Sequence, residues 1–264
     1  MPSVSNIAVG AAMAGAAAQK ARHQMNESIA RLSTGIRSMY GGDAAGQSVA
    51  NSLGAKGASF AVAARNAEDG ISFLQSAESL LLEMAALTTR LRELGIQYSN
   101  SGLLTLTDQA ALNAEATAIG DAIDGIADNM KFNGKALVGS ATAIEVGIND
   151  AGDTATIGTA TSIAITNTDN LTGANGVDGS ADTALGTIAK SLGNVAAGMQ
   201  ALKGYQAAAS STAANLKAAA ARIQDTDYAL ETANLTKAAI LNQSAMAMVA
   251  QANQAQQAIL TVIQ

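Results

Sequence analysis

The sequence predicts a mainly α-helical fold, with long antiparallel coiled-coil helices and a small β-hairpin region in the middle of the chain. Three observations support this fold class. The chain has 264 residues but a single proline, Pro2, so no proline interrupts a long helix. Apolar residues recur at alternating steps of three and four along most of the chain, which is the pattern of a coiled-coil seam. Hydrophobic residues make up 48% of the chain and aromatic residues only 3%, which favours thin helices packed closely together over a wide aromatic core.

The first helical stretch is expected at about residues 4–39. Its apolar stripe is rich in alanine, so a partner helix can come close although little area is buried. The stripe contains Ile7, Ala11, Ala14, Ala18, Ala21, Met25, Ile29, Leu32 and Ile36. Gly35 and the pair at residues 41–42 then interrupt the period, and a mostly helical, alanine-rich segment is expected to about residue 64.

The third stretch has the best heptads of the chain, because large side chains occupy its seam at nearly every step. This seam contains Phe73, Ala77, Leu80, Met84, Leu87, Leu91, Leu94 and Tyr98. A fourth helix is expected to be capped by Thr107 with Asp108 and closed by the pair at residues 133–134. Its stripe contains Leu112, Ala116, Ile119, Ile123, Ile126 and Met130.

The middle of the chain, from residue 139 to about residue 184, has a different character. Gly, Thr, Ser, Asn and Asp dominate it, and apolar and other residues alternate at 144–148 and 162–166, which predicts short strands joined by turns. One or two hairpins are therefore expected, in a segment too short for a substantial separate outer domain. Helical period resumes at Leu185 and continues loosely to Ile223.

The last stretch, residues 226–264, keeps an apolar stripe almost to the end of the sequence. Its seam contains Leu241, Ala245, Met248, Ala252, Ala255, Ile259 and Val262. Such a stripe needs a partner helix, because terminal residues fray unless something holds them. We therefore expect residues 1–42 and 226–264 to form one discontinuous coiled coil, and residues 43–225 to form a rod-like helical bundle that carries the hairpin region at about 139–184.

The terminal stripes are also the candidate assembly site. Alanine seams bury too little area to make a firm pair in a single chain, so packing between identical chains is expected to complete them. This assembly seam consists of Ile7, Ala11, Ala14, Ala18, Ala21, Leu32, Ile36, Leu241, Ala245, Met248, Ala252, Ala255, Ile259 and Val262.

Other chemistry is poorly supported by the sequence. The net charge of −6 argues against nucleic acid as a partner, and no run of residues is apolar enough for membrane insertion. The chain has no cysteine and one histidine, His23, so no metal or cofactor is expected. The acidic residues Asp121, Asp124 and Asp128 share helical spacing and are interpreted as a solvated face. No catalytic or nucleotide-binding motif occurs, so an enzyme is not expected.

Several motifs, in the right order along the chain, resemble those of bacterial flagellin, the subunit of the flagellar filament. They are LSTG at 32–35, DAAG at 43–46, RNAEDGIS at 65–72, RLREL at 90–94, FNG at 132–134, VG at 146–147, RIQDTDYA at 222–229 and AQANQ at 250–254. The sequence departs from the family pattern at Gly42, where an acidic residue is usual, and in its short middle, where relatives often carry large outer domains.

The resemblance implies that the terminal helices form the inner tube of a helical homopolymer and that the inner helices with the hairpin form the surrounding tube. It implies as partners the flagellar export apparatus, a chaperone, the cap and the hook-associated proteins, and an extracellular location reached without a cleaved signal peptide. In agreement, no Lys or Arg precedes the weakly apolar start of the chain, where the first basic residue is Lys20. Arg90, Leu94 and Glu115 match the family motif that animal Toll-like receptors recognise, although Gly95 and Gly120 interrupt its surroundings.

We therefore expect a structural subunit that self-assembles into the extracellular flagellar filament and supports bacterial swimming. A hook–filament junction protein is the nearest alternative, because it shares the terminal pattern. A secreted helical adhesin or lipid-binding bundle is a further alternative. It would need a basic or aromatic face, and none is evident in the sequence.

Overall fold

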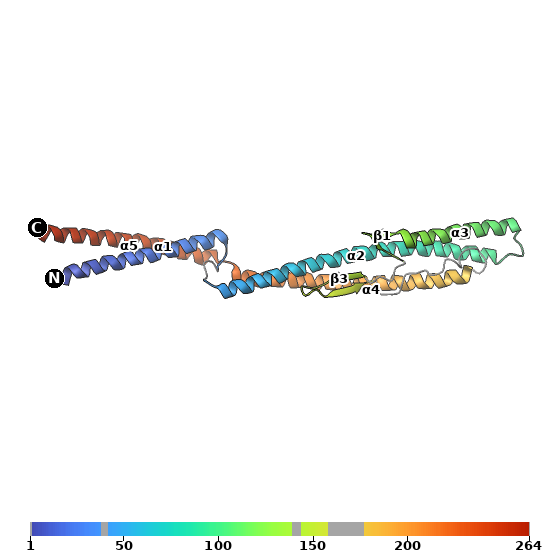
Figure 1. Ribbon diagram of the computed structural model, residues 1–264, viewed down its shortest axis with the longest axis horizontal. Coiled ribbons are helices and arrows are strands. Elements are labelled where there is room, and N and C mark those ends of the chain that lie inside the picture. Colours follow the sequence, from blue (N-terminus) through green and yellow to red (C-terminus); the bar gives the residue numbers. More distant parts are fainter. Residues whose placement is uncertain (1, 38–41, 139–143, 158–176, 264) are drawn as a thin grey trace. The chain divides into compact units, whose positions relative to one another are not determined.

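The computed structural model describes residues 2–37, 42–138, 144–157 and 177–263. Helices dominate these residues, and two small antiparallel hairpins lie between α3 and α4 in the sequence (Figure 1). The elements are α1 (Pro2–Thr34), α2 (Ala44–Tyr98), α3 (Leu106–Asn129), β1 (Lys131–Phe132), β2 (Lys135–Ala136), β3 (Ile144–Gly147), β4 (Thr154–Ile157), α4 (Val177–Gln224) and α5 (Tyr228–Ile263). The predicted fold class is therefore confirmed.

The chain divides into two compact units. Residues 1–55 and 216–264 make the first, here called the terminal unit, and residues 56–215 make the second, here called the central unit. Because α2 and α4 are long, each contributes residues to both units. The boundary predicted from sequence, at residues 42 and 226, stays a prediction about how the filament is divided.

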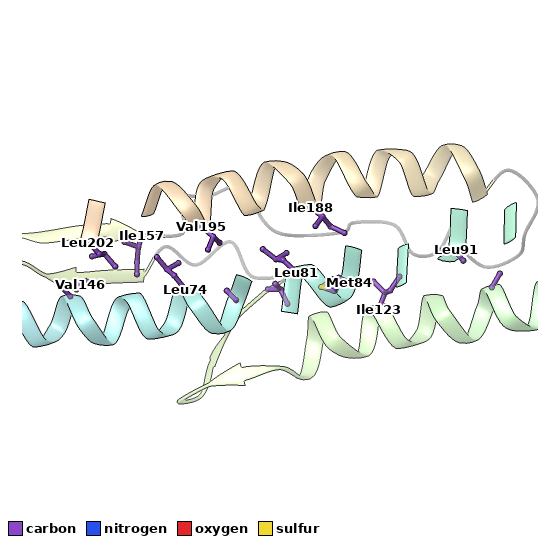
Figure 2. Packing of buried hydrophobic residues seen from close by; sticks show 14 of the residues in the cluster. Leu74, Leu81, Met84, Leu91, Ile123, Val146, Ile157, Ile188, Val195 and Leu202 are labelled. Atoms are coloured by element: carbon purple, nitrogen blue, oxygen red, sulfur yellow. The ribbon is translucent and has the colours of Figure 1, made fainter. Parts of the chain in front are cut away.

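Large aliphatic side chains fill the core of the central unit, where α2 lies between α3 and α4 (Figure 2). Leu74, Leu81 and Met84 of α2 are fully buried, together with Ile123 of α3 and Ile188 of α4. Because α2 has helices on two sides, its buried face is wider than a single seam. The stripe predicted from Phe73 to Tyr98 contains part of this face and leaves out Leu74 and Leu81.

The β3–β4 hairpin packs onto the central unit through Val146 and Ile157, which belong to the same core. Gly70 of α2 makes room for it, because a Cβ at this position would lie 2.9 Å from Cδ1 of Leu202 and 3.1 Å from Cγ2 of Val146. In the turn, the Asn149 side chain accepts hydrogen bonds from two backbone N–H groups. The strand predicted at 144–148 is thus present, paired with β4.

Several predicted boundaries were wrong. α1 ends at Thr34, short of residue 39, because Gly35 adopts a φ of +72°, which ends the helix. The second and third predicted stretches are one continuous helix, α2. α4 begins at Val177, so the helical region starts before the predicted residue 185, and the alternating run at 162–166 lies outside the described residues.

The structure also corrects the two ends of α3. Its N-cap is Thr105 and not Thr107: the Thr105 hydroxyl accepts from the Asp108 N–H, and the Asp108 carboxylate accepts from the Thr105 N–H, a capping box. The Thr105 hydroxyl also donates to the Asp108 carboxylate at 2.7 Å, and this bond, followed by that from the Thr105 N–H, holds the pKa of Asp108 below its ordinary value. At the other end, Asn133 and Gly134 form the turn of the β1–β2 hairpin, both with positive φ, which suits Asn-Gly in a tight hairpin.

Candidate assembly interface of the terminal helices

In the terminal unit, α1 and α5 pack side by side in antiparallel directions, with the two ends of the chain close together (Figure 1). Short side chains occupy the contact: Ala18 and Ala21 of α1 and Ala238 and Ala245 of α5 are buried. Alanine lets the two backbones come close, but each residue removes little apolar area from water. The pair therefore gains less from burial per turn than the central core does.

The structure places the predicted seam residues in different environments. Partly buried positions are Ala11, Ala14, Leu32, Ile36, Ala252 and Ala255. On α5, however, Leu241 is 47% exposed and Met248 is 65% exposed, whereas Ala245 is buried. The side chains of Ile7, Ile259 and Val262 lie outside the description. Within one chain, the predicted stripe of the last helix is thus shared between a face toward α1 and a face toward solvent.

Sequence reasoning missed two polar members of the face of α5 that turns toward α1. This face steps by four and three through Glu231, Leu235, Ala238, Asn242, Ala245, Val249 and Ala252, all of them buried or partly buried. Glu231 and Asn242 were passed over because the search counted apolar residues. The available signal was the spacing of Ala238, Ala245 and Ala252, which are seven residues apart.

Glu231 forms a polar cluster with side chains of α1. Arg31 Nη1 lies 3.6 Å from Glu231 Oε1, and Arg31 also lies 4.0 Å from Glu27, one turn earlier on its own helix. Ser28 is buried beside them. These side chains border a polar cavity of about 250 Å³, which is also lined by Gln24, Asn234 and Lys237. Among the described residues, Oε1 of Glu231 and Oδ1 of Asn242 are buried and have no hydrogen-bond partner.

A backbone bridge joins the segment after α1 to the turn between α4 and α5. The Thr226 N–H donates to the Gly35 carbonyl at 2.9 Å, and the Arg37 N–H donates to the Gln224 carbonyl at 2.8 Å. Ile36 and Asp225 pair between these two bonds as an isolated antiparallel bridge. The terminal unit is therefore held at one end of the α1–α5 pair by main-chain hydrogen bonds that do not depend on side-chain identity.

The Arg37 side chain extends this connection to the start of α2. Its guanidinium donates to the Ile223 carbonyl and, at 2.7 Å, to Asp43. Asp43 in turn accepts from the Gly46 N–H at 2.8 Å, an N-terminal capping contact. The pKa of the Asp43 carboxyl lies below its ordinary value. The hydrogen bond from the Gly46 N–H lowers it most, and the hydrogen bond from the Arg37 guanidinium lowers it further. Asp43 directly follows Gly42, the position at which the sequence departs from the family pattern.

Apolar side chains remain on the outer faces of both terminal helices. Val9, Met13 and Ile29 are exposed on α1, and Leu230, Ile240, Leu241, Met246 and Met248 are exposed on α5. On α5, Ile240 and Leu241 also border a shallow groove of about 600 Å³. Apolar side chains that gather on an exposed protein surface are typical of a site for packing against another molecule.

Arg90, Leu94 and Glu115 lie on the central unit. Arg90 donates two hydrogen bonds to Glu115, at 2.7 and 3.0 Å, and pairs with Glu93 at 3.1 Å. Its hydrogen bonds to Glu115 and then to Glu93 raise the pKa of Arg90. Leu94 is completely buried in the core, so only Arg90 and Glu115 of the three present side chains on the surface.

The described residues offer little else that could carry chemistry. They contain no cluster of three or more His, Cys, Asp or Glu side chains suited to a metal ion. His23 is exposed and lies 3.1 Å from Glu27 on the same helix. The described helices also include none that is long and apolar enough to span a membrane.

The family comparisons cover both units. Residues 5–143 match the bacterial flagellin N-terminal helical region, and residues 179–263 match the bacterial flagellin C-terminal helical region. The chain belongs to the bacterial flagellin family. As a flagellin it is a structural filament subunit and not an enzyme.

Curated relatives agree with this assignment over nearly their whole length. This flagellin is 32% identical to flagellin FlaB2 of Treponema pallidum, to the flagellar filament 33 kDa core protein of Treponema phagedenis and to a flagellin of Bacillus subtilis. Each alignment covers 90% of this chain and 92% of the relative. A middle without large outer domains is therefore shared with these relatives.

Proposed function

We propose that this flagellin polymerises with copies of itself into an extracellular helical filament for swimming, and that the paired α1 and α5 helices form its inner core. Residues 1–42 and 226–264 would line the inner tube, and residues 43–225 would form the surrounding tube. The observation that carries this proposal is the apolar surface that remains exposed after α1 and α5 have packed together.

The two faces of α5 suggest that some residues of the assembly seam make contacts within the chain and others make contacts between subunits. Ala18, Ala21 and Ala245 are buried inside one chain, so they serve the α1–α5 pair. Leu241 and Met248 are exposed in the single chain, so they serve contacts with neighbouring subunits. Identical subunits that meet through such head-to-tail contacts generate an open helical filament when the rotation does not close a ring.

The remaining partners belong to the same proposal. Export without a cleaved signal peptide, with help from a chaperone and the cap, suits a chain that lacks cysteine and whose terminal helices gain little from burial alone. Such a chain can be carried unfolded and can order its ends on assembly. Hook-associated proteins would meet the same terminal helices at the ends of the filament. A Toll-like receptor would meet Arg90 and Glu115, which are exposed, while Leu94 would act only by supporting them.

Seeded polymerisation followed by electron microscopy tests the proposal. The chain lacking residues 226–264 should form no tubes, while the helicity of its central unit survives in circular dichroism. Full-length M248E should also fail to polymerise, because packing would bury a charge, although its monomer fold is unchanged.

Q243E is the matched control, because Gln243 is an exposed residue of α5 outside the apolar surface, and it should polymerise like the parent chain. Tubes from the truncated chain, or from M248E at the parent's rate, would show that the terminal helices are not the assembly site.

A further inference from the structure

The alanine seam between α1 and α5 does not by itself define how the two helices are aligned. Ala238, Ala245 and Ala252 are seven residues apart on α5, and Ala11 and Ala18 are seven apart on α1. A slide of one heptad, on the order of 10 Å at the rise of an α-helix, therefore sets alanine against alanine again. Burial of apolar area distinguishes such alignments only weakly, because the facing side chains are the same.

The Arg31–Glu231 ion pair is different, because the native alignment brings the two charges together and a slide separates them. Glu231 is 6% exposed, and its carboxylate lies 3.6 Å from the Arg31 guanidinium across the helix pair. After a slide of one heptad in one direction, neutral Gln24 would take the place of Arg31 (31 − 7 = 24). A buried carboxylate that loses its cation is strongly disfavoured, so the slid alignment carries a large cost.

We propose that the Arg31–Glu231 pair sets the register of α1 against α5, as a specificity-determining contact within an otherwise degenerate alanine seam. Buried polar residues are known to fix register in coiled coils at some expense of stability. Ser28 and the polar cavity beside the pair keep this stretch from closing as an ordinary apolar layer. The proposal concerns the single chain and does not depend on polymerisation.

The absence of cysteine makes the register measurable, because two introduced thiols are the only ones present. Ala18 lies 13 residues before Arg31 (31 − 18 = 13), and Ala245 lies 14 residues after Glu231 (245 − 231 = 14). In an antiparallel pair these positions face each other, and both are buried. The pair A18C/A245C therefore reports the native register. The pair A18C/A238C reports the slide of one heptad that brings Gln24 opposite Glu231, because Ala238 lies seven residues before Ala245 and is also buried.

The experiment compares the yields of the two intramolecular disulfides after mild oxidation of the full-length chain, in the soluble state and in seeded tubes. The parent should favour the 18–245 disulfide. In E231A this preference should fall by roughly tenfold, the factor that corresponds to 1.4 kcal/mol. Helicity should be unchanged or higher, because alanine is the better helix former.

The charge-swapped chain R31E/E231R should regain most of the preference, which a merely structural role for Glu231 would not produce. K237A is the matched control, because Lys237 lines the same cavity without belonging to the pair, and it should behave as the parent. An unchanged preference in E231A would overturn the proposal and assign the register to the Ile36–Asp225 bridge alone. A parent without preference in either state, or a swap that restores nothing, would overturn it as well.

Discussion

The two units of this flagellin use the same helical period with different side chains. In the central unit, α2 is enclosed by α3 and α4, and leucine, isoleucine and methionine fill the space between them. In the terminal unit, α1 and α5 meet mainly through alanine, and several of the larger apolar side chains, among them Leu241 and Met248, are exposed. A leucine core makes a unit that is stable alone, whereas an alanine seam with an apolar exterior makes a unit that gains from neighbours. The difference separates the part that holds the subunit together from the part proposed to join subunits.

Truncation of a central leucine should give the largest effect. L81A removes a fully buried side chain of α2 and should lower the free energy of unfolding by about 2–5 kcal/mol, since a cavity remains. Urea titration followed by circular dichroism measures it. The neighbouring L82A is the control, because Leu82 is 55% exposed, and its effect should stay within about 0.5 kcal/mol. Equal losses in both variants would mean that the central core is not leucine-based.

Two glycine-to-alanine substitutions in the central unit should change the free energy of unfolding in opposite directions. G70A places a methyl group against Leu202 and Val146, and overpacking of about 1–3 kcal/mol exceeds the gain in helix propensity of about 1 kcal/mol. G193A, at an exposed helical position with no heavy atom within 4 Å of the added Cβ, should be stabilised by about 0.5–1 kcal/mol. Thermal unfolding of the two variants compares them. A stabilised G70A would show that the β3–β4 hairpin does not pack on α2 as described.

A substitution in the alanine seam should lower stability by a smaller amount, and the loss should be confined to the terminal unit. A18G should cost about 1 kcal/mol, chiefly through helix propensity, because alanine loses little buried area when it becomes glycine. The loss should appear in the thermal transition of the terminal unit, followed by hydrogen exchange along α1 and α5. Exchange in α2 between residues 74 and 94 should not change. Faster exchange there would break the distinction between the two units.

The smallest effect is expected from acid. The pKa of Asp43 is lower in the folded chain than the ordinary value of 3.8, so its carboxylate stabilises the fold above that value. This contribution is lost as the pH falls below about 4 and through the folded pKa. D43N should therefore show a shallower loss of terminal-unit helicity than the parent between pH 5 and pH 2. The same slope in both chains would mean that the contacts of this carboxylate with the Gly46 N–H and with Arg37 contribute nothing to stability.

Much of the fold followed from periodicity, and the failures have physical causes. The heptads of α2 predicted a buried seam, but periodicity could not show that helices lie on both sides, which is why Leu74 and Leu81 were missed. Asn133-Gly134 was interpreted as a helix end, although the same dipeptide is a strong hairpin signal. On α5, Glu231 is buried and Asn242 is partly buried. A stripe drawn through apolar residues alone leaves both out and therefore lies on a different face of the helix. Only the structure, in which α1 and α5 are packed together, shows that the Glu231 carboxylate faces Arg31.

The bridge between Ile36 and Asp225 also bears on the order of folding. It joins positions 189 residues apart (225 − 36 = 189), so closing it from a fully unfolded chain costs roughly 4–5 kcal/mol in loop entropy. Once residues 56–215 have folded, only two short segments remain free between the partners, and most of that cost has already been met. The helices at the two ends of the sequence are therefore expected to pair last, after the middle of the chain has brought its own contacts into place.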